Sequence, residues 1–315
     1  MSVIYLSQDG LSVHKSGGKI LIKQNDKELF SLPRCNVENI VVMNNVQISH
    51  AVIMDILDRG GTIVYLDKAG SIKGYLGQPL FRGETIIKQA MSYNDPVKRI
   101  QIAKVILKNK LLTQKSMLLS YNKRIKSENI KKAVVKIMHF VKLMDNQTDI
   151  DKLLGIEGIT AKTYYDCFPQ IMSNSCFVWQ GRNRRPPKEP INSMLSFAYY
   201  LLEKDVKMCL MEMGLVSSIG FLHSVDNYRE SLVYDIIETF RTSIAEKFVF
   251  KAINLKMFTL DDFCYDADKC IFTEEARKKF ICAYDEFSKQ EDSTGSNSCE
   301  KIKKFITEIK KMILC

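Results

Sequence analysis

The stretch SVIYLSQDGLSVHKSGGKILIKQNDKELFSL, residues 2–32, decides the fold class of the first part of the chain. Short runs rich in apolar and β-branched residues are separated by Asp9-Gly10, Gly17-Gly18 and Asn25-Asp26, which are pairs that favour tight turns. The pattern therefore predicts four short strands joined as successive β-hairpins.

The segment after Pro33 continues as short elements separated by turn residues. These are a buried strand in ENIVVM (38–43), a short helix in HAVIMDILDR (50–59), a break at Gly60-Gly61, and strands in TIVYLD (62–67) and SIKGYL (71–76). We therefore predict a small β-rich, β-sandwich-like domain over residues 1–83 that contains one helix.

The apolar period changes at about Ile86, where side chains three and four residues apart become apolar. A chain of 315 residues favours two domains over one. We therefore predict an α+β protein whose second, larger domain, residues 84–315, is all α. Its expected helices include 97–112, 129–144, 192–213, 230–253, 273–289 and 300–314.

The charge of the chain suggests a polyanionic partner without proving one. The 46 Lys and Arg residues outnumber 36 acids and give a formal net charge of +10, as nucleic-acid-binding proteins often have. Many basic proteins nevertheless bind no nucleic acid specifically, so charge alone leaves the question open.

Cysteine spacing and hydropathy narrow the class of protein further. The nine cysteines include no CxxC pair, so neither a zinc site nor a disulfide framework is indicated. No apolar run reaches membrane-spanning length, and the first ten residues lack the features of a signal peptide. These patterns predict a cytoplasmic protein with no membrane partner.

A candidate metal site lies in GFLHSVDNYRESLVYDIIETFR, residues 220–241. His223 precedes a predicted helix on which Asp235 and Glu238, three residues apart, project from one side. Imidazole nitrogen and carboxylate oxygen together suit Mn²⁺, Mg²⁺ or Zn²⁺. The alternative is an ordinary polar helix face beside a surface histidine, and spacing alone favours that reading.

Glu157 stands out as an acid among apolar residues in LLGIEGITAKTYYDCF. Gly158 beside it would let a phosphate backbone or another helix approach closely. The alternative is a glutamate near a helix start, where the helix dipole favours negative charge.

A stiff basic loop lies between these segments. Three prolines in FVWQGRNRRPPKEPIN deny it a helix, and it could present phosphate-binding cations with Trp179 and Asn192 beside them. The alternative is a solvated linker in which Trp179 is a core anchor. The cations are Arg182, Arg184, Arg185 and Lys188.

Four motifs in this order resemble the CRISPR-associated endonuclease family, the integrase subunit that inserts spacers. They are GIEG (155–158), NRRPPKEPINSMLSF (183–197), GFLH (220–223) and SLVYDIIETFR (231–241). The β-rich start, with NVENIVVMNNVQIS, also resembles the amino-terminal domain of that family. Glu189 and Tyr228 depart from the residues common there, which leaves the local loop shape open.

The resemblance implies that Glu157, His223 and Glu238 bind Mg²⁺ or Mn²⁺, with Asp235 supporting the site. DNA contacts would come from the basic loop and the segment after it. The expected DNA-binding residues are Arg182, Arg184, Arg185, Lys188, Asn192, Arg229 and Arg241; Arg241 could instead pair with Glu238 one turn earlier.

The implied activity is attack by the 3′-hydroxyl of a short duplex spacer precursor on a phosphodiester in the CRISPR repeat. The implied assembly is a homodimer formed through the β-rich domain and joined by a small CRISPR-associated partner dimer. Two alternatives stay open: a catalytically silent DNA-binding scaffold, and a metal-dependent nuclease that cuts DNA without joining it.

Overall fold

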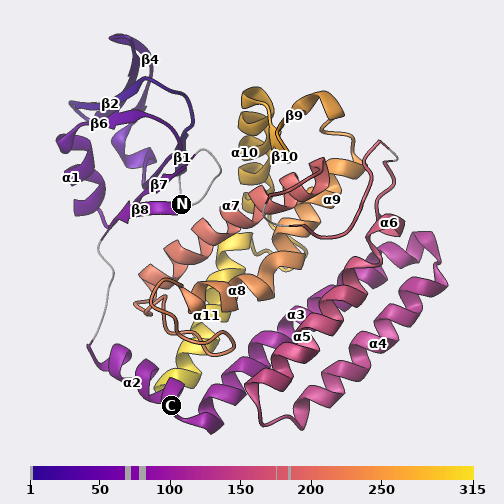
Figure 1. The fold of residues 1–315 in the computed structure, drawn as a ribbon. Coiled ribbons are helices and arrows are strands. Elements are labelled where there is room, and N and C mark those ends of the chain that lie inside the picture. The colour runs from indigo at the N-terminus through magenta and orange to yellow at the C-terminus, as the bar shows by residue number, and fades with distance from the viewer. Residues whose placement is uncertain (1–2, 68–71, 78–82, 175, 184–185) are drawn as a thin grey trace. The chain divides into compact units, whose positions relative to one another are not determined.

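The chain divides into two compact units, Met1–Leu80 and Phe81–Cys315. The computed structural model describes residues 3–67, 72–77, 83–174, 176–183 and 186–315. In these ranges, helices long and apolar enough to cross a membrane are absent. Each unit is shown in Figure 1.

The first unit contains two four-stranded sheets and one helix (Figure 1). Core residues come from both sheets and from helix α1 (His50–Asp58), so the unit has one shared hydrophobic core. The first sheet has the order β1 (Val3–Leu6), β5 (Asn39–Val42), β7 (Ile63–Leu66), β8 (Ile72–Leu76); the second has β4 (Lys27–Pro33), β3 (Lys19–Gln24), β2 (Leu11–Ser16), β6 (Val46–Ile48).

The prediction of successive hairpins is correct for two of the three connections. Strands β2 and β3, and β3 and β4, pair antiparallel across their turns. Strand β1 instead pairs in parallel with β5, and β2 pairs in parallel with β6, a strand that we did not predict separately. All four residues of β5 are buried, as is usual for a strand with parallel neighbours on both sides.

The second unit is predominantly helical, as predicted. Helices α3, α4 and α5 run side by side (Figure 1), and α7 packs against both α8 and α11. The helices are α2 (Gly83–Asn94), α3 (Pro96–Ile125), α4 (Glu128–Asp145), α5 (Ile150–Tyr165), α6 (Phe168–Ile171), α7 (Pro190–Glu212), α8 (Ser231–Phe240), α9 (Lys247–Asn254), α10 (Glu274–Lys289) and α11 (Ser298–Leu314).

The expectation of an all-α second domain is wrong in one place. Strands β9 (Phe263–Asp266) and β10 (Lys269–Phe272) form an antiparallel hairpin between α9 and α10. Phe263 and Phe272 stack across it with ring centroids 4.8 Å apart, and Phe272 lies 4.9 Å from Phe280 of α10. Aromatic packing of this kind stabilises cross-strand pairs. The sequence analysis missed the hairpin because each strand has only four residues and lies between segments with a helical apolar period.

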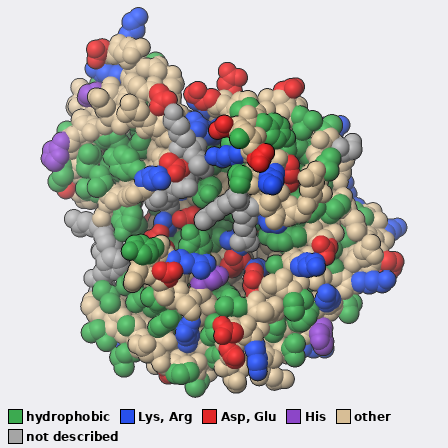
Figure 2. All heavy atoms as spheres, viewed as in Figure 1, with side chains coloured by type: hydrophobic (Ala, Val, Ile, Leu, Met, Phe, Trp, Pro, Cys, Tyr) green, Lys and Arg blue, Asp and Glu red, His purple; other side chains and the backbone are tan. Residues whose placement is uncertain are grey.

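Charged and apolar side chains intermingle on the surface of the helical unit. The face in Figure 2 carries Lys and Arg interspersed with Asp and Glu. The excess of positive charge therefore does not form a separate single-sign patch on this face.

Asp55 of α1 is the electrostatic centre of the β-rich unit, and we predict that its charge stabilises the fold. Its side chain is almost fully buried. The carboxylate forms ion pairs with Lys15 at 2.5 Å, Arg34 at 3.0 Å and Arg59 at 2.9 Å. The hydrogen bond from Lys15 lowers the pKa of Asp55 against the opposing effect of burial. We expect Asp55→Asn to lower the free energy of unfolding of the full chain by about 1–3 kcal/mol in urea melts.

The lowered pKa of Asp55 also fixes the sign of the pH dependence. The stabilisation is complete above the ordinary aspartate pKa near 3.9 and is lost as pH falls through the lower value in the folded protein. Asp55→Asn should therefore show a smaller loss of stability below about pH 4. Asp58→Asn, an exposed position on the same helix, is the control, and equal acid sensitivity of the wild type and Asp55→Asn would contradict the assignment.

Candidate metal and nucleic-acid site

One cavity of the helical unit gathers the three predicted metal ligands. Its volume is about 690 Å³, and Glu157, His223 and Glu238 all line it. Arg182, Arg229 and Arg241 line the same cavity, together with tyrosines from α7 and α8. The lining residues come from three parts of the sequence, 157, 182–203 and 223–241. Together they bring acids, an imidazole and guanidinium groups to one cavity.

Helix α5 places Glu157 in its middle rather than at its start. The helix begins after Asp149, whose side chain accepts the backbone N–H of Asp151 at 2.9 Å. Glu157 is therefore too far along the helix for the dipole explanation to apply. A Cβ on Gly155 or Gly158 would meet open space, so within the described ranges no other helix packs closely against these two glycines.

Helix α8 is buried along nearly its whole length, so its acids do not lie on a solvated face. Asp235 is fully buried and Glu238 is 5% exposed. Burial alone would raise the pKa of Glu238, but the charges of Arg241 and Lys110 lower it to about 2. Glu238 is therefore an anion in the interior of the unit.

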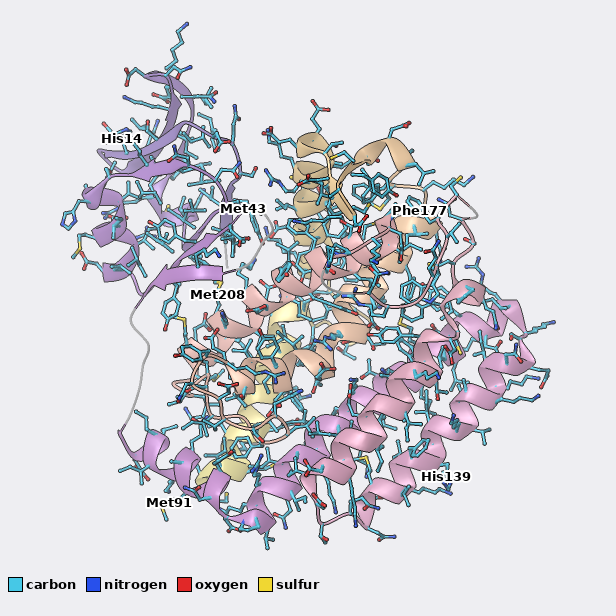
Figure 3. The ribbon with its side chains drawn as sticks, viewed as in Figure 1. His14, Met43, Met91, His139, Phe177 and Met208 are labelled. Atoms are coloured by element: carbon cyan, nitrogen blue, oxygen red, sulfur yellow. The ribbon has the colours of Figure 1, made fainter. Side chains whose placement is uncertain are left out.

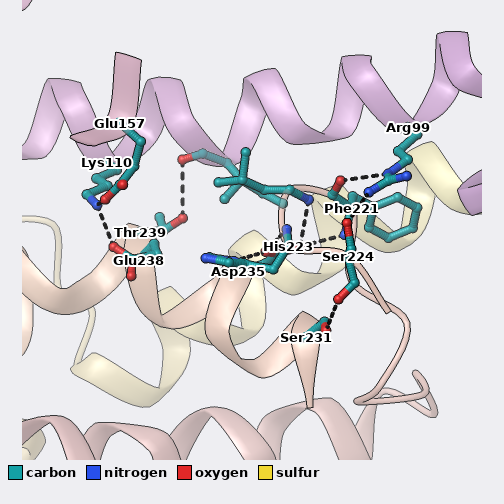
Figure 4. Close-up of polar contacts among 12 residues, drawn as sticks. Arg99, Lys110, Glu157, Phe221, His223, Ser224, Ser231, Asp235, Glu238 and Thr239 are labelled. Carbon is teal, nitrogen blue, oxygen red and sulfur yellow. Dashed lines mark hydrogen bonds and ion pairs between the residues drawn. The ribbon is translucent and has the colours of Figure 1, made fainter. Parts of the chain in front are cut away.

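Asp235 organises the loop that carries His223 (Figure 4). One carboxylate oxygen accepts the backbone N–H groups of Phe221 at 2.6 Å and Leu222 at 3.0 Å. The other accepts the backbone N–H of His223 at 3.0 Å and contacts Nδ1 of its ring at 2.7 Å. A carboxylate at Nδ1 fixes the tautomer in which Nδ1 carries the proton, so Nε2 is the nitrogen that can bind a cation.

Lys110 of α3 lies between the two glutamates that were predicted as ligands. Its ammonium donates to Glu157 Oε1 and, at 2.5 Å, to Glu238 Oε2 (Figure 4). Burial alone would lower the pKa of Lys110, but the charges of Glu238 and Glu157 outweigh burial and hold that pKa above its ordinary value. The space between the carboxylates thus accepts a positive charge.

The chemistry of the three side chains fits a divalent cation. In this structure the ammonium of Lys110 occupies the space between the two carboxylates. One imidazole nitrogen and two carboxylates are ligands that suit Mn²⁺ or Mg²⁺. In the part of the chain that the structure describes, no three His, Cys, Asp or Glu side chains converge closely enough to hold a metal ion. Ligation by all three residues therefore remains a proposal.

Arg241 pairs with Glu238, which is the structural alternative that the sequence left open. Its guanidinium donates to Glu238 Oε1 and lies 5.0 Å from the centre of the Tyr199 ring. Arg241 also begins a π-helical turn, Arg241–Glu246, and such turns are frequent at functional sites. Buried Glu246 ends the turn and accepts the hydroxyls of Tyr164 at 2.8 Å and Tyr199 at 2.7 Å.

The described residues of the predicted basic loop differ in their surroundings. Arg182 lines the cavity and donates to Asn192 Oδ1 at 2.7 Å. Asn192 is fully buried and donates to the carbonyl of Gly181 at 2.8 Å, so it secures the loop instead of facing DNA. Trp179 packs on Phe168 with ring centroids 4.9 Å apart, as the core-anchor alternative requires. Arg184 and Arg185 lie outside the described residues.

Two further DNA-binding candidates differ in their surroundings. Arg229 lines the cavity with its guanidinium 4.8 Å from the centre of the Tyr234 ring. Lys188 lies in the loop before α7, and its backbone N–H donates to Asn183 at 2.8 Å.

Sequence reasoning missed Lys110, Tyr199 and Glu246. Lys110 could have been found from the sequence, because it falls on the same predicted buried face of α3 as Leu107 and Leu111. A lysine at a buried helical position needs an anionic partner. No local pattern marks the partners of Glu246, because Tyr164, Tyr199 and Glu246 lie on separate elements.

Comparison with known proteins identifies the family. The sequence pattern of the family described as CRISPR associated protein Cas1 matches residues 4–286. The chain belongs to this family. The predicted family is thereby confirmed.

A curated relative carries the same family name, and two solved structures share the fold. The CRISPR-associated endonuclease Cas1 1 of Thermodesulfovibrio yellowstonii is 27% identical over 99% of both chains. A casposase bound to an integration product has the same fold, with a TM-score of 0.84 at 20% identity over 100% of this chain and 91% of that one. A Cas6-RT-Cas1–Cas2 complex contains a chain with a TM-score of 0.81 at 19% identity, covering 99% of this chain and 35% of that one.

Close packing at Gly220 should be essential for the His223 loop of this Cas1 family member. A Cβ there would meet the Ser231 backbone at 2.7 Å and Asp235 Oδ2 at 2.9 Å. We expect Gly220→Ala to lower the free energy of unfolding by about 1–3 kcal/mol, because the buried loop must shift. Gly155→Ala, on the open side of α5, should raise it by about 0.5–1 kcal/mol. Urea melts of both variants test this pair, and equal shifts would refute the packing argument.

Proposed function

We propose that this chain is a metal-dependent DNA integrase that inserts new spacers into a CRISPR array. The observation that carries the proposal is the cavity shared by Glu157 of α5, His223 of the loop before α8, and Glu238 of α8. Membership of the Cas1 family and the fold shared with a casposase bound to an integration product support the same class of reaction.

The proposed reaction is a transesterification in which a DNA 3′-oxygen attacks a phosphodiester of the repeat. One P–O bond forms as another breaks, the attacking hydroxyl loses its proton, and the leaving oxygen gains one. Glu157, Glu238 and His223 Nε2 would hold Mg²⁺ or Mn²⁺, which polarises the phosphoryl oxygen when bound. Asp235 orients the His223 ring, and Arg182 and Arg229 offset phosphate charge at the cavity.

We also propose the assembly in which the enzyme acts. The β-rich unit, as a sandwich-like domain, would form a homodimer, and a small CRISPR-associated partner dimer would complete the integration complex. The structural neighbour solved in a complex with Cas2 supports such a partner. The duplex spacer precursor and the CRISPR repeat would be its DNA partners.

Hydrolysis by the same centre is a second candidate activity, because relatives are named endonucleases. Water in place of the 3′-hydroxyl would cut the phosphodiester without joining a new strand. Product analysis separates the two, since joining produces a longer labelled strand and hydrolysis produces only shorter ones.

Strand transfer should depend on His223. Removal of a residue that only hydrogen-bonds to a metal ligand lowers metal affinity or activity roughly 10–100-fold. His223 is proposed as a ligand itself, so we expect His223→Ala to lower joining by about 100-fold or more. The measurement is joining of a labelled short duplex to a plasmid that bears a repeat, with Mn²⁺ and the partner protein. His139→Ala, an exposed histidine on α4 (Figure 3), is the matched control. Undiminished joining by His223→Ala in folded protein would refute the proposed centre.

DNA binding should depend on the cations at the cavity and in the loop. We expect Arg229→Ala and Lys188→Ala each to weaken binding across sequences and to reduce the slope of log K against log salt concentration by about 1. The readout is fluorescence anisotropy over a salt series. Lys136→Ala, an exposed position on α4, is the control. Salt slopes unchanged from the wild type would favour the interpretation of the loop as a solvated linker. The same weakening of DNA binding is predicted for Arg184→Ala and Arg185→Ala.

A further inference from the structure

The position of Lys110 has consequences beyond the proposed activity. The side chain is 5% exposed and reaches the two glutamates from α3, whereas the glutamates come from α5 and α8. A buried lysine with two carboxylate partners is not a surface ion pair that solvent would screen. Its ammonium joins three helices at one point.

The charges of the two glutamates are matched by two cations without a metal ion. Glu157 and Glu238 contribute two negative charges, and Lys110 and Arg241 contribute two positive charges. A divalent cation added to this cluster would meet an ammonium already between its ligands. Like charges this close inside a protein repel strongly, because the interior screens them far less than water does.

The two cations are not equivalent in their contacts. Arg241 binds the Oε1 atom of Glu238, whereas Lys110 binds the Oε2 atom of Glu238 and also an oxygen of Glu157. A cation that uses both carboxylates needs the space that Lys110 fills, and Arg241 can keep its contact. Lysine also has a flexible four-carbon stem that can withdraw its ammonium.

We propose that Lys110 is a resident counter-cation, which holds Glu157 and Glu238 in register in the metal-free protein and gives up both carboxylates when a divalent cation binds. Lys110 thereby acts as a positioning residue that sets the threshold for metal loading. This inference rests on the proposed metal site and adds to it a residue that competes with the metal.

Manganese binding to the full chain tests the proposal without any measure of activity. Titration calorimetry at constant pH would compare the wild type with Lys110→Met, which keeps the length of the side chain and removes its charge. We expect Lys110→Met to bind Mn²⁺ roughly tenfold or more tightly, because the competing charge is gone. The control is Lys108→Met, at an exposed lysine on the same helix that faces Asp145. This variant should bind Mn²⁺ like the wild type.

Thermal melts add a second readout. Without metal, Lys110→Met should melt below the wild type, because buried Glu238 and half-buried Glu157 lose their shared partner. Mn²⁺ should raise its melting temperature by more than it raises that of the wild type. If Lys110→Met does not fold without metal, Lys110→Arg replaces it, and its forked guanidinium should weaken Mn²⁺ binding.

The outcomes separate this inference from the proposed function. Unchanged or weaker Mn²⁺ binding by folded Lys110→Met, or unchanged or tighter binding by Lys110→Arg, would overturn the role of Lys110. If His223→Ala nonetheless weakens Mn²⁺ binding, the proposed metal site survives. If the wild type binds no Mn²⁺, or binds it no better than His223→Ala does, the metal site and this inference are both wrong.

Discussion

The helical unit is organised around two carboxylates that share one ammonium in its interior. Glu157 on α5 and Glu238 on α8 both accept from Lys110 on α3, and Arg241 neutralises the second oxygen of Glu238. Charges are buried only when they are paired. These contacts therefore tie α3, α5 and α8 together beside the cavity that both acids line.

A second constraint acts on the loop before α8. Asp235 is fully buried and satisfies three consecutive backbone N–H groups as well as the His223 ring. Gly220 permits the close approach that these contacts need. The imidazole is thus oriented by the same helix that supplies Glu238, which is how a chain with four histidines places one of them beside buried carboxylates.

Sequence patterns predicted well where the determining interactions are local. Turn residues at Gly17-Gly18 and Asn25-Asp26 marked hairpins that the structure contains, and the three-to-four-residue apolar period marked the long helices. They failed where a partner lies far away in the chain. Strand β1 pairs with β5 across more than thirty intervening residues, and the β9–β10 hairpin is too short for its alternation to stand out between helices.

The candidate site divides in the same way. Sequence alone determined the family and singled out Glu157, His223, Asp235 and Glu238 as candidates, because motif order is a property of the chain. Only the tertiary structure decided that Lys110 lies between the two glutamates and that Asn192 faces inward. The physical reason is that burial and charge pairing depend on which helices meet, and local sequence spacing does not encode that meeting.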